Sequence, residues 1–69
     1  MNDLSRRDDS LVRLSEVKQR TGLSRATIYR RMDAGTFPPK VSLGAHSVAW
    51  YKSDLDRWVA DPTGWQIAA

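Results

Sequence analysis

Helix-capping residues and apolar positions at helical spacing predict three short helices. The first of them covers about 16–20 and follows Ser15, a residue type that often caps helix N-termini. It stops near Gly22, since glycine readily takes the left-handed conformation found where helices end. This pattern predicts a short first helix.

A second helix is predicted immediately afterwards. Ser24 is in the N-cap position, and Leu23 and Ile28 have the spacing of a hydrophobic staple. The helix is expected to continue through Ala34 and to end at Gly35. Because only a three-residue turn separates it from the first helix, the two segments predict a helix-turn-helix.

The following segment favours a β-hairpin. Its two prolines, Pro38 and Pro39, exclude a helix there and favour extended chain. Apolar and polar residues then alternate over 40–43 and over 48–51, with a short glycine-containing loop at 44–47.

A third helix is predicted after Ser53, which has Asp56 three residues later in a position resembling a capping box. It ends near Pro62. One face of it carries apolar residues at helical spacing, namely Leu55, Trp58 and Val59.

These elements together predict an α+β, mostly α fold: a small winged helix-turn-helix of three short helices and a two-stranded β-hairpin wing. We expect a flexible N-terminal arm over 1–10, a folded domain over 11–61 and a C-terminal tail over 62–69. The pattern leaves open whether Trp65 in that tail folds back on the core or is exposed. The predicted core comprises Leu14, Val17, Leu23, Ile28, Met32, Phe37, Val41, Leu43, Val48, Trp50, Leu55, Trp58 and Val59.

Composition narrows the function classes. The 69 residues contain no cysteine and one histidine, so no disulfide and no structural zinc site is expected. No apolar run approaches the roughly 20 residues of a membrane span, and the N-terminus lacks the apolar stretch of a secretory signal, so we expect a cytosolic protein. No cofactor motif, catalytic triad or carboxylate dyad is evident, which argues against an enzyme.

Positive charge is concentrated in the centre of the chain. The net charge is +3, but residues 18–40 carry six lysines or arginines against one aspartate. Such a concentration attracts a polyanion, and double-stranded DNA is the partner expected for a helix-turn-helix.

The second helix carries the candidate DNA contacts. Its buried side is defined by Ile28 and Met32. Base contacts are predicted for Arg25, Ala26 and Arg30, because arginine can bond guanine bidentately and a small residue admits the backbone. Contacts with the sugar-phosphate backbone are predicted for Lys18, Ser24, Thr27, Tyr29, Arg31 and Lys40.

The hairpin tip is expected to act as a wing against the DNA backbone or in a minor groove. It consists of Gly44, Ala45, His46 and Ser47.

With these residues identified, the chain resembles the AlpA-type regulators of prophages and integrated elements, relatives of phage excisionases and, more distantly, of the MerR-type winged helix. The resemblance covers about residues 11–60 and is carried by LSEV at 14–17, TGLSRATIYR at 21–30, GTFPPKV at 35–41, LG at 43–44, VAW at 48–50 and SDL at 53–55. It implies a DNA-binding accessory or regulatory protein whose second helix enters the major groove. His46 stands where such proteins often have arginine at the wing tip, and no long dimerisation helix follows Val59.

Three functions stay open from the sequence. The first is a transcriptional regulator that binds an operator, and the second is an excisionase that assists an integrase at an attachment site. The third is a protein-interaction module such as an anti-repressor. Self-association, as a homodimer or side by side on DNA, would have to use small surfaces such as Trp65 and Ile67.

Overall fold

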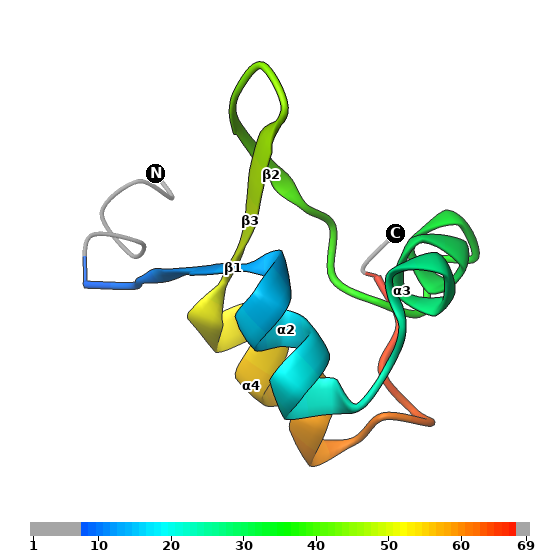
Figure 1. The fold of residues 1–69 in the computed structure, drawn as a ribbon. Coiled ribbons are helices and arrows are strands. Elements are labelled where there is room, and N and C mark those ends of the chain that lie inside the picture. Colours follow the sequence, from blue (N-terminus) through cyan, green and yellow to red (C-terminus); the bar gives the residue numbers. More distant parts are fainter. Residues whose placement is uncertain (1–7, 68–69) are drawn as a thin grey trace.

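The computed structural model describes residues 8–67. The predicted flexible arm therefore lies mostly outside the described residues, and so does the end of the predicted tail. The elements follow one another in the order β1 (Leu11–Arg13), α2 (Leu14–Thr21), α3 (Arg25–Asp33), β2 (Val41–Gly44), β3 (Ser47–Tyr51) and α4 (Lys52–Ala60) (Figure 1).

The strands form one antiparallel sheet in the order β1-β3-β2. The predicted hairpin is present as β2 and β3, with Val41 opposite Ala49. The segment before the first helix, for which no strand was predicted, is a third strand, and its Val12 lies opposite Trp50. Its burial alternates, with a buried residue between two exposed ones, because one face of the strand covers the core.

Two helices begin two residues earlier than predicted. The N-cap of α2 is Arg13 and that of α4 is Tyr51, so the expected caps Ser15 and Ser53 are inside their helices. In both cases a strand runs directly into the helix, and its last residue supplies the extended backbone that an N-cap requires.

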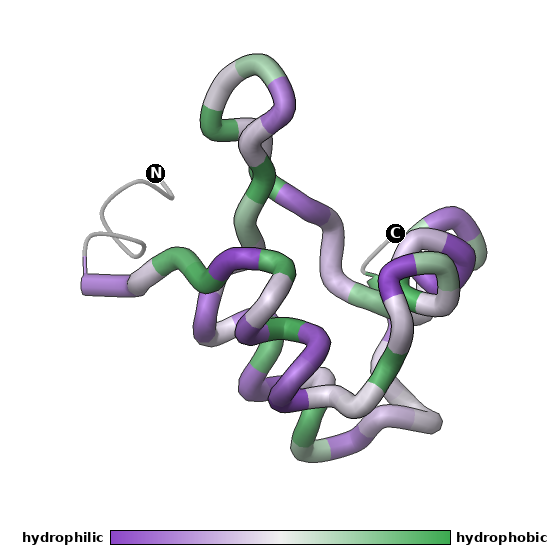
Figure 2. The backbone as a smooth tube through the Cα atoms, in the orientation of Figure 1, coloured by the Kyte–Doolittle hydropathy of each residue, from purple (hydrophilic) through white to green (hydrophobic). Residues whose placement is uncertain are grey.

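The core lies between the sheet and the helices. Val12 and Ala49 are buried although they were not in the predicted core, whereas Leu43 and Val59 were predicted there and are 44% and 39% exposed. Leu43 lies next to the last residue of β2. The tip of this hairpin projects beyond the helices (Figure 2). The core cluster contains Val12, Val17, Ile28, Phe37, Trp50, Leu55 and Trp58.

The connection between α3 and β2 is held by two tryptophans. Trp50 donates its indole N–H to the carbonyl oxygen of Pro38 at 3.0 Å, and Trp58 donates its own to that of Thr36 at 2.9 Å. The rings of Phe37 and Trp58 also pack with their centroids 5.0 Å apart. These contacts fix the wing relative to α3.

The tail returns to the body of the protein. Trp65 packs against the core, which settles the alternatives left open for it. The N–H of Ile67 donates to the carbonyl oxygen of Gly35 at 2.9 Å, so the end of the described chain reaches the C-terminal end of α3 (Figure 1).

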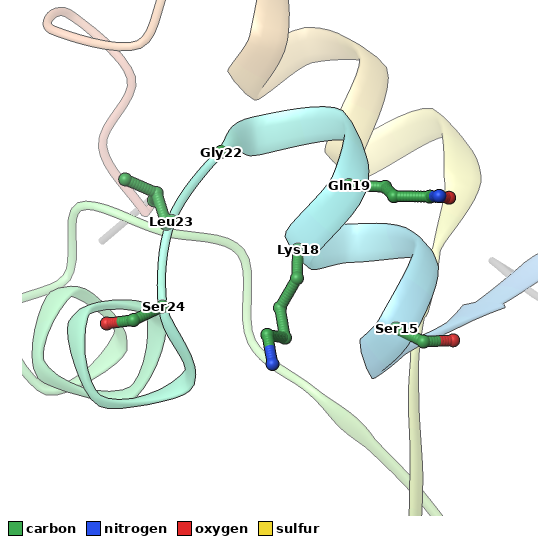
Figure 3. Close-up of a pocket in the computed structure, with 6 residues that line it drawn as sticks. All are labelled: Ser15, Lys18, Gln19, Gly22, Leu23 and Ser24. Carbon is green, nitrogen blue, oxygen red and sulfur yellow. The ribbon is translucent and has the colours of Figure 1, made fainter.

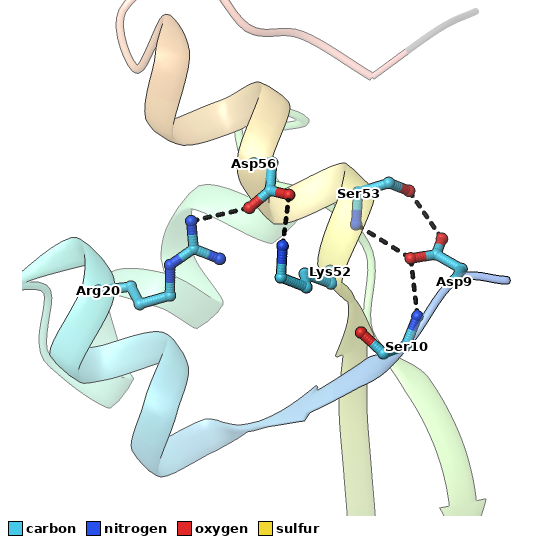
Figure 4. Close-up of polar contacts among 6 residues, drawn as sticks. All are labelled: Asp9, Ser10, Arg20, Lys52, Ser53 and Asp56. Carbon is cyan, nitrogen blue, oxygen red and sulfur yellow. Dashed lines mark hydrogen bonds and ion pairs between the residues drawn. The ribbon is translucent and has the colours of Figure 1, made fainter.

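A polar cluster joins α2 and α4 (Figure 4). Asp56 accepts from Arg20 at 2.8 Å and from Lys52 at 3.0 Å, rather than forming the capping box predicted with Ser53. The hydrogen bonds from Lys52 and then Arg20 hold the pKa of Asp56 below its usual range. Ser53 instead donates its hydroxyl to Asp9 at 2.7 Å.

Within residues 8–67, no helix is both long and apolar enough to cross a membrane.

Candidate nucleic-acid interface

The second helix of the helix-turn-helix, α3, is fixed at both ends. Its N-cap Ser24 accepts from the N–H of Thr27 at 3.2 Å, as the sequence predicted. At the other end, the N–H of Thr36 donates to the carbonyl oxygen of Arg31 and that of Gly35 to the carbonyl oxygen of Met32. These two bonds form a Schellman motif, which satisfies the carbonyl groups of Arg31 and Met32.

The exposed side of α3 presents the predicted base-contacting residues. Ile28 is fully buried and Met32 packs against the core, which turns Ala26 and Arg30 outward, and Arg25 is exposed in the first turn of the helix. The structure therefore places these three side chains on accessible positions of one short helix.

Three side chains on α3 and its cap are linked by hydrogen bonds. The hydroxyl of Ser24 donates to that of Thr27 at 3.1 Å, and Arg30 donates from one terminal nitrogen to the same Thr27 oxygen at 3.4 Å. Arg30 is thereby directed along the exposed surface toward the N-terminal half of α3.

Tyr29 forms a platform for two cations. The guanidinium of Arg25 lies 4.7 Å from the centre of its ring, and the ammonium of Lys40 lies 5.5 Å from it. Tyr29 itself is half-buried and packs against the core. The structure thus brings together three of the predicted contact residues, on the border of α3 that faces the wing.

Arg31 lies on the opposite border of α3, which separates it from this group. Lys18 projects from α2 into a shallow pocket of about 520 Å³ between α2 and the start of α3, across from Ser24 (Figure 3). The predicted backbone-contacting residues are therefore distributed on both sides of α3.

The wing tip is a tight turn. Gly44 lies opposite Ser47, with an irregularity in the register after Ser42. His46 has a φ of 63°, a left-handed conformation in which histidine is more frequent than most other residues. Gly44, Ala45 and His46 are exposed and Ser47 is half-buried.

A second cleft of about 520 Å³ lies between the wing and α3. Arg13 lies at its border, and its Nε donates to the carbonyl oxygen of Val48 at 3.1 Å. No DNA contact was predicted for Arg13 or Ser15, because the run LVR at 11–13 shows no alternation of apolar and polar residues. Its exposed–buried–exposed burial is evident only in the structure. The residues lining the cleft are Arg13, Leu14, Ser15, Arg25, Tyr29, His46 and Val48.

No group of three or more histidine, cysteine, aspartate or glutamate side chains that could hold a metal ion exists among residues 8–67.

The fold is a small winged helix-turn-helix, and the second helix of its helix-turn-helix carries exposed arginines. The chain belongs to the family described as prophage CP4-57 regulatory protein (AlpA), whose model matches residues 10–63.

Two curated proteins illustrate the relationship. The chain is 44% identical over 57 residues to the DNA-binding transcriptional activator AlpA of Escherichia coli K12, covering 72% of this chain and 80% of that protein. It is 46% identical over 52 residues to the uncharacterised protein ORF88 of Enterobacteria phage P4, covering 75% of this chain. The match spans 59% of the length of the phage P4 protein. No solved structure gives a significant match.

Proposed function

We propose that this chain is a sequence-specific double-stranded DNA-binding protein that regulates transcription of a prophage or integrated element. The main observation behind this proposal is the orientation of α3. Its buried Ile28 turns Arg30 and Ala26 outward, and both ends of the helix are fixed by capping bonds. A helix presented in this way fits the major groove, which is wide enough to admit it.

In this proposal Arg30 and Ala26 face base edges, and the cations around them bond phosphates. Arg30 supplies paired donors that match guanine O6 and N7, and Ala26 allows close approach of the helix. Lys18, Arg31 and Lys40 lie on both sides of α3 and contact the two flanking backbones. The name of the E. coli relative, a DNA-binding transcriptional activator, supports regulation of transcription over the excisionase alternative.

Selection of bound duplexes from a random pool tests this proposal. A recovered site should bind more tightly than random duplex, and log Kd should rise with log salt, with a slope of about 5 for six phosphate contacts. Failure to retard any duplex at low salt would refute the proposal and favour the protein-interaction module.

The recovered site also separates regulator from excisionase. Placed upstream of a reporter, it should change expression when the protein is supplied without an integrase. An effect on integrase-dependent excision with none on the reporter would assign the chain to the excisionase class.

A further inference from the structure

We propose that the cleft between the wing and α3 binds one phosphodiester group of the DNA backbone, with Arg13 as its main cation. This inference rests on the proposed function, because it names where one strand of the bound duplex lies. It adds to the interface two residues outside the basic segment 18–40, Arg13 and Ser15.

The lining of the cleft has the chemistry of an anion site. It combines Arg13, Arg25 and His46 with the hydroxyl-bearing Ser15 and Tyr29, and it includes no carboxylate. Guanidinium groups suit phosphate especially well, since their planar donors match two phosphate oxygens at once.

The side chain of Arg13 is held in place beside the cleft before any ligand binds. The bond from its Nε to the carbonyl oxygen of Val48 joins β1 to β3 and uses one of the five guanidinium donors. The terminal nitrogens carry the other four, and they are the donors needed for a phosphate. Because the side chain is already anchored, less rotamer entropy is lost on binding.

Arg25 lines the cleft on the side formed by α3. Its guanidinium stacks on Tyr29, on the border of α3 that faces the wing, rather than beside Arg30. We therefore assign Arg25 to the phosphate in the cleft and leave the base reading to Arg30. A strand held between Arg13 and Arg25 would set the register in which α3 meets the bases.

The test compares Arg13→Ala with Arg57→Ala on selected and random duplexes. Arg57 is an exposed arginine on α4, so both variants lose one positive charge and only one changes the cleft. Arg13→Ala should weaken binding to both duplexes roughly tenfold and lower the salt slope by about one. Arg57→Ala should leave the affinity for DNA and the salt slope within error of the wild type.

Two further experiments, with Arg13→Lys and with a modified duplex, test whether Arg13 bonds one particular phosphate. Lysine should restore the salt slope but only part of the affinity, because it cannot bond bidentately. A single methylphosphonate in the selected duplex removes one phosphate charge, and at one position it should weaken the wild type while leaving Arg13→Ala unaffected. Thermal unfolding of each variant checks that it is folded.

Two results overturn the inference. The first is that Arg13→Ala and Arg57→Ala have the same affinity for DNA and the same salt slope. The second is that a methylphosphonate at every position weakens Arg13→Ala as much as it weakens the wild type. If either occurs while the wild type still binds its selected duplex and Arg30→Ala loses sequence preference, the cleft assignment alone fails. Absence of binding by the wild type refutes the proposed function itself.

Discussion

Trp50 donates its indole N–H to the carbonyl oxygen of Pro38 at 3.0 Å, and both residues are fully buried. The bond joins β3, which forms half of the wing, to the connection that leaves α3. Together with the bond from Trp58 to Thr36, it determines the position of the wing relative to α3. The two DNA-contacting parts in our proposal are therefore positioned through the hydrophobic core.

Trp50→Phe tests this anchor. The variant keeps an aromatic ring but leaves a buried carbonyl oxygen without its donor, which costs about 1–3 kcal/mol before the lost volume is counted. Urea unfolding measures the free energy of unfolding. Val59→Ala, at a position 39% exposed, is the control and should change stability by no more than about 0.5 kcal/mol. Equal effects of the two variants would contradict a structural role for the bond.

The helices were predictable because their signals are local. Ser24, Gly22 and Gly35 mark helix ends through their own conformation and capping bonds, and the structure has them in those roles. The strand β1 was missed because the run LVR at 11–13 shows no alternation of apolar and polar residues, and its partner strand around Trp50 lies far along the chain. The burial of Val12 depends on that pairing.

The candidate site also has one part that could be predicted from the sequence and one part that could not. The outward side of α3 follows from helical periodicity, so the exposure of Arg30 and Ala26 could be predicted from the sequence, and their base contacts stay a prediction. The cleft could not be predicted from the sequence, because Arg13 and His46 come to line one cleft only when β1 and β2 pair with β3. Charge counting by segment also placed Arg13 outside the basic region, although it lines the same surface.

Arg30→Ala tests base reading. On the selected duplex we expect a loss of about 1–3 kcal/mol in binding free energy and a flattened preference at one base pair. Lys18→Ala is the matched variant, because it removes one cation from α2 and should weaken all duplexes alike while lowering the salt slope by about one. An Arg30→Ala effect of equal size on selected and random duplex would contradict the base contact.

His46→Arg tests the wing tip. At the exposed turn beside the cleft, a guanidinium offers a permanent charge and more donors than an imidazole, so binding to any duplex should become tighter. His46→Asn is the control, because asparagine also tolerates the left-handed backbone at φ 63° but carries no charge. Unchanged affinity of the arginine variant at low salt would show that the tip does not approach DNA.

The cluster around Asp56 predicts a pH dependence of stability. Because bonds from Lys52 and Arg20 hold the folded pKa of Asp56 below its ordinary value of 3.8, the cluster stabilises the fold above that value. The contribution is lost as pH falls through the folded pKa. Urea unfolding at a series of pH values should therefore show that Asp56→Asn flattens the decline below about pH 4. Asp33→Asn, which removes an exposed carboxylate from α3, should retain the wild-type decline; parallel curves for all three proteins would contradict the role of Asp56.

The contact of the tail with α3 can be isolated by comparing two glycines. Gly22 and Gly35 have φ values of +73° and +78°, so alanine at either position costs about 1–2 kcal/mol in backbone conformation.

A Cβ at Gly22 would meet nothing within 4 Å, whereas one at Gly35 would lie 3.3 Å from Cγ2 of Ile67. We expect Gly35→Ala to lower the free energy of unfolding more than Gly22→Ala, because it also crowds the tail. The excess should vanish in an Ile67→Ala background, since shortening that half-exposed side chain removes the crowded methyl group. Equal losses for the two glycine variants would mean that the tail yields freely and does not restrain the end of α3.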